Sequence, residues 1–180
     1  MQFMKHLLLP LMAILFLAAC GEEGTTPVVN NDTDNSVEEK VESAYPKTFV
    51  DGRGKEVTFN EKPTKIVSTT LAVDEFLVDL VAPENILAVT QMSTDAGISN
   101  VAGKTDAIDT KFETVTAEQV LALNPDLVII PSYVSGEVLD QIESAGITTF
   151  QVVDDSSFEG ILKTVETLGQ IVGEEETAAA

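Results

Sequence analysis

The sequence predicts an α/β protein with a parallel sheet that is covered by helices on both faces. Residues 116–131 give the first observation, because they predict a helix, a two-residue break and then a strand. The strand at 127–130 consists of four apolar residues without alternation, which is typical of a strand buried on both faces. The second observation is that strands and helices alternate in this way from Lys65 to Gly173. Such an order favours parallel strands joined by right-handed crossovers.

The helix in residues 116–124 has clear start and stop signals. Thr116 is followed three residues later by Gln119, so the two side chains can form a capping box. Pro125 disfavours helical geometry at the residue before it, and the helix is therefore expected to end at Asn124. Glu118 is the second helical residue, where the helix dipole favours a carboxylate and the side chain points to solvent.

Periodicity and turn residues predict the remaining elements. A turn at 51–54 separates two short β-rich runs, which indicates a hairpin. Residues 91–114 form a long connection that contains a turn of helix. A second capping box, Ser156 with Glu159, starts the last long helix, which Gly173 interrupts. The expected strands are 48–50, 56–59, 66–68, 86–89, 127–130 and 147–153, and the expected helices are 72–81, 116–124, 136–145 and one that ends at 172.

The N-terminal residues indicate a lipoprotein signal peptide. Lys5 precedes an apolar run at 7–17, which is shorter than the about 20 residues needed to span a bilayer. Cys20 is the single cysteine and therefore cannot form an intrachain disulfide. It ends the sequence Leu-Ala-Ala-Cys, which resembles the bacterial lipobox. We expect residues 1–19 to be removed and Cys20 to be lipidated; the alternative is an ordinary signal peptide that happens to end at a cysteine.

Residues 20–46 are expected to form an acidic, disordered tether, because they contain few large apolar side chains. The predicted product is exported and lipid-anchored to the outer face of the cytoplasmic membrane. The net charge of -20 argues against nucleic acid as a partner, since phosphates would be repelled. The folded part is expected to extend over residues 47–173.

Histidine and cysteine usage argues against most enzyme classes. His6 is the single histidine and lies in the predicted signal peptide, so the mature chain lacks the groups for Ser-His or Cys-His catalysis and for the usual zinc sites. We therefore expect no catalytic residues, no metal site and no resident cofactor. A flavodoxin-like enzyme that binds phosphate at residues 68–70 is one alternative. Asp154 and Asp155 are either a cation-binding pair or, more simply, a solvated turn.

Ligands of open parallel sheets bind beyond the carboxyl ends of the strands. Tyr133 follows one such strand end and offers a flat apolar face with a phenol, which suits a bulky chelate or macrocycle; the alternative is a tyrosine packed on the shoulder of the domain. The loops at this edge supply the candidate ligand-binding residues, which are Ser68, Thr69, Thr70, Gln91, Met92, Ser132 and Tyr133.

Four stretches together are similar to one family. They are residues 49–57 (FVDGRGKEV), 62–68 (KPTKIVS), 84–90 (ENILAVT) and, most specifically, 116–129 (TAEQVLALNPDLVI). They resemble the bacterial ABC-transporter substrate-binding proteins that capture ferric siderophores, haem or cobalamin. Residues 69–72 (TTLA) depart from the Ser-Pro-Ala often found in that family after the first strand.

The resemblance implies two α/β lobes joined by one rigid helix, with the ligand held between them. Residues 47–173 then correspond to the N-terminal lobe, and residues 174–180 to the start of the inter-lobe helix, where the chain looks cut. Glu118 matches the family glutamate that meets an arginine of the membrane permease. The implied function is that of a monomeric receptor that delivers an iron chelate, most simply a ferric siderophore, to an ABC permease. The alternatives are a haem or cobalamin receptor and a one-lobe surface lipoprotein that binds another protein.

Overall fold

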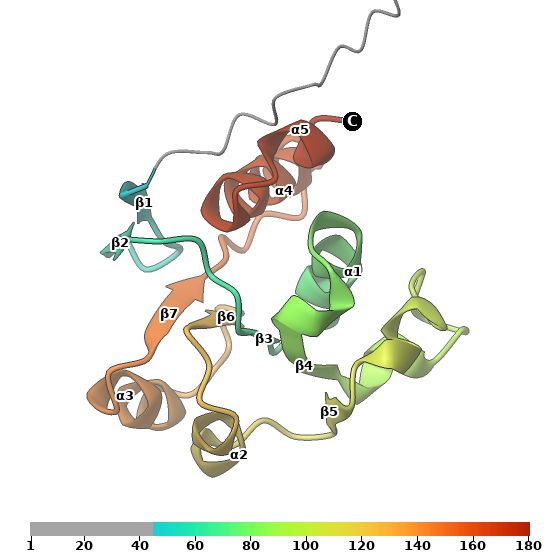
Figure 1. Ribbon diagram of the computed structural model, residues 1–180, viewed down its shortest axis with the longest axis horizontal. Coiled ribbons are helices and arrows are strands. Elements are labelled where there is room, and N and C mark those ends of the chain that lie inside the picture. The colour runs from blue at the N-terminus through green and yellow to red at the C-terminus, as the bar shows by residue number, and fades with distance from the viewer. Residues whose placement is uncertain (1–44) are drawn as a thin grey trace, which may run out of the picture. The chain divides into compact units, whose positions relative to one another are not determined.

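The computed structural model describes residues 45–180. The expected signal peptide, the lipidation site Cys20 and nearly all of the expected tether lie outside these residues. The described residues form a two-stranded antiparallel hairpin and a five-stranded parallel sheet (Figure 1).

The secondary structure follows the alternation expected from the sequence. The strands are β1 (Lys47–Val50), β2 (Glu56–Phe59), β3 (Ile66–Ser68), β4 (Ile86–Thr90), β5 (Thr110–Phe112), β6 (Leu127–Ile130) and β7 (Thr148–Gln151). The helices are α1 (Leu71–Leu80), α2 (Ala117–Ala122), α3 (Gly136–Ser144), α4 (Phe158–Val172) and α5 (Glu175–Ala178). Three short 3-10 turns join them, η1 (Pro83–Asn85), η2 (Gln91–Thr94) and η3 (Lys104–Ala107).

The strand order in the large sheet is β5-β4-β3-β6-β7, and all pairs are parallel. The chain therefore moves outward from β3 in one direction through β4 and β5, and then returns to the other side of β3 with β6 and β7. Helices α1 and α4 lie on one face of the sheet and α2 and α3 on the other (Figure 1). The predicted fold class is thus confirmed.

Both faces of the sheet are buried, which explains the uninterrupted apolar strands. Along β6, Leu127 and Ile129 pack with α1, α4 and the hairpin, whereas Val128 and Ile130 pack with α2 and α3. All four side chains are at most 1% exposed. This is the arrangement expected for a parallel strand in the middle of a two-sided core.

Helix α2 confirms the start and stop signals. The Thr116 side chain accepts a hydrogen bond from the backbone of Gln119, and the Gln119 side chain completes the capping box. Asn124 has a φ of 48°, in the left-handed region that asparagine tolerates better than most residues. The residue before Pro125 therefore leaves the helix, as predicted.

Two sequence-based expectations were wrong in detail. The connection at 91–114 contains β5, an edge strand whose central residue Lys111 is half-buried, so it has no apolar run to mark it. The cap of α4 is Ser157, whose side chain accepts from the backbone N–H of Gly160 at 3.1 Å. The sequence predicted Ser156 as the cap, with Glu159 three residues later completing a capping box. With Ser157 as the cap, the residue three positions later is Gly160, which has no side chain to complete the box.

The hairpin is attached to the edge strand β7. The backbone N–H of Gly52 donates to the Gln151 carbonyl at 2.7 Å, which satisfies an acceptor at the end of β7. Arg53 forms ion pairs with Asp51 at 2.6 Å and with Glu143 of α3 at 2.9 Å. Partial burial raises the pKa of Glu143, but hydrogen bonds from Thr149, Lys55 and Arg53 outweigh this effect and lower the pKa to about 2. The hairpin thus covers part of an edge that would otherwise be free to pair.

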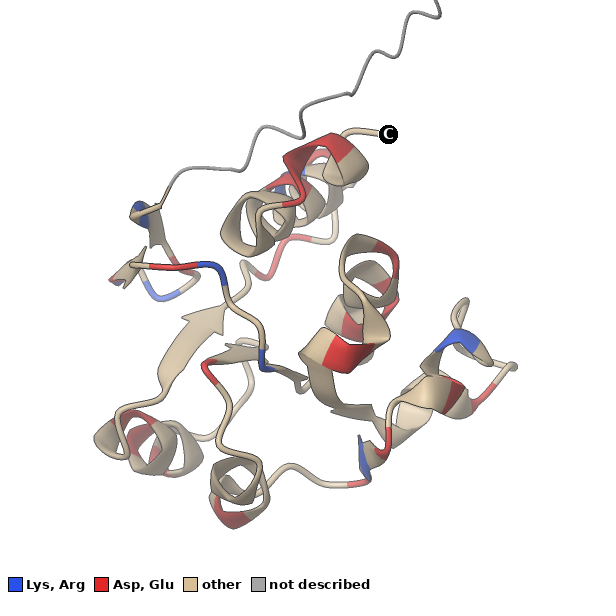
Figure 2. Ribbon diagram, in the orientation of Figure 1, with Lys and Arg blue, Asp and Glu red and all other residues tan. Residues whose placement is uncertain are grey.

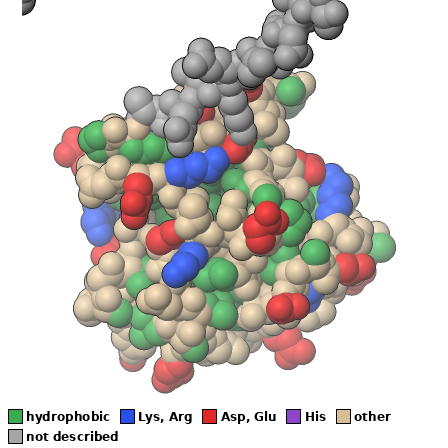
Figure 3. Space-filling model, in the orientation of Figure 1, with side chains coloured by type: hydrophobic (Ala, Val, Ile, Leu, Met, Phe, Trp, Pro, Cys, Tyr) green, Lys and Arg blue, Asp and Glu red, His purple; other side chains and the backbone are tan. Residues whose placement is uncertain are grey.

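Acidic residues predominate on the helices, whereas most Lys and Arg residues lie in the hairpin and the connections (Figure 2). On the face shown in Figure 3, basic side chains are scattered among acidic ones and form no continuous basic patch. Within residues 45–180, no helix is both long and apolar enough to cross a membrane.

Candidate functional site

A cleft of about 470 Å³ lies at the carboxyl ends of the strands, where it is bounded by the segments after β3, β6 and β7 and by the first turns of α1 and α4. This position follows from the strand order. The connections from β3 and β6 leave the sheet on opposite faces, and the crevice between such neighbours is where open α/β sheets bind ligands. The lining residues are Thr70, Ala72, Val73, Glu75, Phe76, Pro131, Ser132, Tyr133, Val152, Val153, Asp154, Asp155, Ser156, Ile161 and Thr164.

Three of the candidate ligand-binding residues meet in this cleft. Tyr133 is 74% exposed, and its hydroxyl donates at 3.5 Å to the Thr70 hydroxyl across the opening. The Ser132 hydroxyl donates to Asp154 at 3.2 Å and so ties the loop after β6 to the segment after β7. The tyrosine is therefore presented to solvent at the mouth of the cleft, and the alternative of a tyrosine packed on the shoulder of the domain does not describe its position.

The other four candidates do not line the cleft. Ser68 and Thr69 are nearly fully buried, and their hydroxyls donate to the carbonyls of Thr70 and Ile129. These hydroxyls are directed to the backbone, which gives the phosphate-binding alternative no support. Gln91 and Met92 are exposed but follow β4, which lies on the far side of β3 from the cleft.

Sequence reasoning missed the cleft residues that belong to helices. Val73, Glu75 and Phe76 come from the first two turns of α1, and Ile161 and Thr164 from the start of α4. A signal was nevertheless present, because helices that follow parallel strands begin at the ligand-binding edge.

Carboxylates line two sides of the cleft. Glu75 accepts from the backbone N–H of Asn100 at 2.7 Å, and Asp155 accepts from the backbone N–H of Ser157 at 2.9 Å. Hydrogen bonds from Ser157 lower the pKa of Asp155. Asp155 thus has the role of a turn residue that precedes the α4 cap. Residues 45–180 contain no group of three or more His, Cys, Asp or Glu side chains arranged to hold a metal ion.

A buried carboxylate lies beneath the same edge of the sheet. Asp74 in α1 is 0% exposed and accepts from the Thr90 backbone at 3.0 Å and from the Thr90 hydroxyl at 2.5 Å. Its other carboxylate oxygen has no hydrogen-bond partner among the described residues. Burial raises the pKa of Asp74, against the opposing effect of the hydrogen bonds from Thr90. Asp74 thereby joins α1 to the end of β4.

We predict that Asp74→Asn changes how stability depends on pH. A carboxyl with a raised folded-state pKa binds protons more readily in the folded state, so stability is highest below the unfolded pKa of about 3.9 and falls as pH rises toward the folded value. The free energy of unfolding of the variant, relative to the parent, should therefore increase between pH 4 and pH 7 in urea titrations.

The exposed Asp140→Asn variant on α3 is the matched control, since it removes the same charge from the surface. The difference in free energy of unfolding between Asp74→Asn and the parent could instead stay constant across this pH range, or change as it does for the control. Either result would contradict a raised pKa for Asp74.

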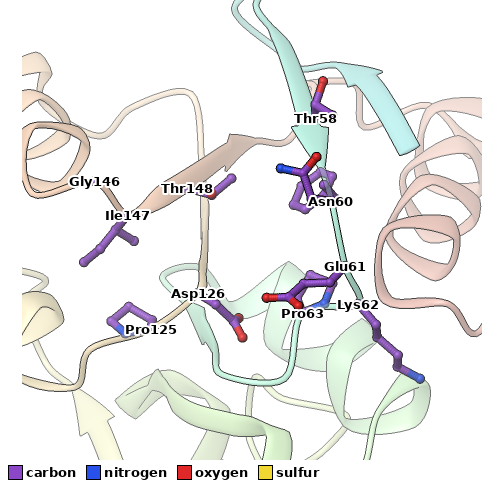
Figure 4. A pocket seen from close by; sticks show the side chains of 11 residues that line it. Thr58, Asn60, Glu61, Lys62, Pro63, Pro125, Asp126, Gly146, Ile147 and Thr148 are labelled. Carbon is purple, nitrogen blue, oxygen red and sulfur yellow. The ribbon is translucent and has the colours of Figure 1, made fainter. Parts of the chain in front are cut away.

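A second, smaller cavity of about 250 Å³ lies at the opposite end of the sheet, among β2, the segment after it and the starts of β6 and β7 (Figure 4). Its carboxylate Asp126 accepts from the backbone N–H groups of Thr64 and Lys65, at 2.9 and 3.0 Å. This carboxylate aligns the starts of β3 and β6, so its role is structural.

Glu118 is exposed at the second position of α2, as the sequence predicted. Helix α2 runs antiparallel to the strands, so its start lies at the same edge of the sheet as the cleft. The structure therefore places Glu118 on the same side of the molecule as the cleft.

A two-sided parallel sheet with a cleft at its switch point defines an open α/β lobe of the class that binds small molecules beyond its strand ends. Residues 66–180 match the family model described as periplasmic binding protein. The chain belongs to this family.

Relatives and solved structures agree with this assignment. The chain is 29% identical over 171 residues to an uncharacterised ABC transporter substrate-binding lipoprotein, YvrC, of Bacillus subtilis, covering 93% of this chain and 51% of the relative. It is 26% identical over 137 residues to a cobalamin-binding protein of Halobacterium salinarum, covering 76% and 37%. The chain thus spans about half the length of these curated relatives, or less.

Among solved structures, the haem-binding protein HmuT superposes with a TM-score of 0.59 at 28% identity, covering 75% of this chain and 43% of that one. A structure from an ABC-type Fe3+-hydroxamate transport system of Saccharomonospora viridis gives a TM-score of 0.58 at 20% identity, covering 76% and 51%, and supports the fold alone.

Proposed function

We propose that this protein is the substrate-binding component of an ABC importer, that it captures an iron chelate, most simply a ferric siderophore, and that it delivers the chelate to a membrane permease. In this proposal the chain is exported and anchored through lipidated Cys20. The ligand contacts the cleft around Tyr133, and Glu118 contacts the permease. The protein acts as a receptor without a catalytic step or a resident cofactor.

The observation that carries the proposal is the open cleft at the switch point of the sheet, with an exposed aromatic ring at its mouth. Binding sites for small molecules combine apolar walls with a few polar groups that orient the ligand. Here Val73, Phe76 and Ile161 supply the apolar walls, and Thr70 and Ser132 supply hydroxyls. An exposed tyrosine is suited to pack against a bulky, partly apolar chelate.

Cobalamin or haem is the second candidate ligand. The names of the Halobacterium salinarum relative and of HmuT favour it, since those proteins are described as binding cobalamin and haem. The cleft supplies no histidine or cysteine for haem iron, since the single histidine of the chain is His6 and the single cysteine is Cys20, but its exposed Tyr133 phenol is also an axial ligand that haem iron accepts. We place the iron chelate first, and haem and cobalamin are its direct competitors in the titration below.

Tyrosine fluorescence provides a direct test, because the chain contains two tyrosines and no tryptophan. In a Tyr45→Phe background the remaining tyrosine, Tyr133, reports on the cleft. The protein is titrated with a ferric trihydroxamate, a ferric catecholate, haem and cobalamin. We expect saturable quenching, and we expect one of the two iron chelates to reach half-saturation at the lowest concentration.

We predict that Tyr133→Leu, followed by calorimetry, weakens chelate binding about threefold to tenfold, the loss expected for one aromatic contact. Tyr45→Phe is the control, since Tyr45 does not line the cleft and its hydroxyl donates to the Ile171 carbonyl at 2.6 Å. Equal affinities for the parent and Tyr133→Leu would show that the ligand does not bind in this cleft.

The one-lobe alternative makes a different prediction about the gene. If the coding sequence continues past Ala180 with a second α/β pattern, ligand binding belongs to a cleft between two lobes, and binding is then measured on the longer product. A stop codon there would favour a one-lobe surface protein whose partner binds near Tyr133 and Glu118.

A further inference from the structure

The charge of the ligand cleft is strongly one-sided. Its lining includes the carboxylates Glu75, Asp154 and Asp155, and it includes no lysine or arginine. Lys163 lines the smaller adjoining groove, which it shares with Asp155, rather than the cleft itself. A ligand that enters from solvent therefore meets negative charge on this lobe.

Neutral donors, not cations, contact these carboxylates. Glu75 is bonded by Asn100, Asp154 by the Ser132 hydroxyl and Asp155 by the Ser157 backbone. None of the three forms an ion pair with a lysine or arginine among residues 45–180. Their charge is thus available to a ligand instead of being neutralised within the lobe.

The carboxylates come from separate segments that line the cleft. Glu75 belongs to α1, whereas Asp154 follows β7, and the aromatic side chains Tyr133 and Phe76 also line the space. The face of an aromatic ring attracts cations. Apolar walls, an aromatic face and carboxylates together suit a ligand with a compact apolar body and a positively charged substituent.

We infer that the ligand presents a cationic group to this cleft, and that the preferred chelate is a ferric trihydroxamate with a free primary ammonium group. This inference rests on the proposed function. Three hydroxamate anions neutralise the ferric ion, so the body of such a chelate is uncharged and packs on the apolar walls. The ammonium group then faces Glu75 or Asp154. A ferric tricatecholate keeps excess negative charge and is repelled.

Two chelates that differ in one charge provide the test. A ferric trihydroxamate with a free primary amine and the same chelate with that amine acetylated are titrated into the full chain by calorimetry. The free amine is expected to bind about tenfold tighter at low salt. The preference should shrink to about twofold in 0.5 M salt, because the Debye length is then only a few ångströms and the charges are largely screened.

Conservative variants assign the preference to residues. Glu75→Gln combined with Asp154→Asn keeps the size and one acceptor oxygen of each side chain, and is expected to abolish the preference by weakening binding of the free amine to that of the acetylated chelate. Glu137→Gln on the exposed start of α3, outside the cleft, is the control and should keep the preference.

The outcomes separate this inference from the proposed function. Equal or tighter binding of the acetylated chelate overturns the inference and leaves the receptor function intact. Loss of the preference in Glu137→Gln would also overturn it, because the effect would then come from overall charge. If neither chelate binds and haem or cobalamin does, the iron-chelate function is wrong, and the inference falls with it.

Discussion

Replacement of Gly52 by alanine is expected to lower the free energy of unfolding by about 2 to 3 kcal/mol, the upper range for an overpacked site. A Cβ atom at this position would lie 2.6 Å from the carbonyl oxygen of Val152 and 3.1 Å from its carbonyl carbon. These backbone atoms cannot move freely, because Gly52 donates to Gln151 at 2.7 Å and Val152 donates to Ile130 at 3.0 Å. Urea denaturation followed by circular dichroism measures the loss.

Gly136→Ala is the matched control for this prediction. Gly136 is the first residue of α3, has no atom within 4 Å of the added Cβ, and does not have a positive φ. Alanine there should be neutral or stabilise by up to about 1 kcal/mol through the entropy of the unfolded chain. If Gly52→Ala behaved like this control, the close attachment of the hairpin to β7 would be disproved.

The attachment of the hairpin connects stability with the ligand cleft. The residue that a larger side chain at position 52 would displace is Val152, which lines the cleft. Gly160 shows a similar close approach on the other side, because its Cβ would lie 2.6 Å from the carbonyl oxygen of Asp155. The segment after β7 is thus fixed at both ends by glycines, which accounts for the position of its carboxylates in the cleft.

Elements with local signals were predicted well. The α2 helix has a capping box at one end and Asn124 before a proline at the other, and β6 has a continuous apolar run. Strand β5 was missed because an edge strand buries only some of its side chains and therefore has no continuous apolar run. Within β5 only Phe112 is buried. The α4 cap was displaced by one residue because Ser156 and Ser157 are adjacent and either can cap a helix.

The candidate site was predicted in part, for a topological reason. The rule that ligands bind beyond strand ends identified Thr70, Ser132 and Tyr133, which line one cleft. The same rule selected Gln91 and Met92, but it does not say which strands are neighbours. Strand order depends on contacts between residues far apart in the sequence, such as the pairing of Val67 with Val128. Single-sequence patterns carry no signal for such contacts.

Charge reversal at Glu118 is expected to have the largest effect on transport. If Glu118 contacts an arginine of the permease, Glu118→Arg places like charges together, which costs several kcal/mol at an interface. Uptake of the labelled chelate by cells that contain the permease should therefore fall at least about tenfold, which corresponds to 1.4 kcal/mol. Ligand affinity should stay unchanged, because Glu118 does not line the cleft.

The start of α3 offers a control with the same geometry. Glu137 is the second residue of α3, as Glu118 is of α2, and both are exposed near the same edge of the sheet. Both reversals change the net charge and the helix-end electrostatics equally, so Glu137→Arg separates a specific contact from a general effect. A specific docking role requires that uptake falls in Glu118→Arg and persists in Glu137→Arg. Equal losses would instead indicate that the acidic surface as a whole steers the receptor to its permease, and uptake unchanged in both would exclude Glu118 from docking.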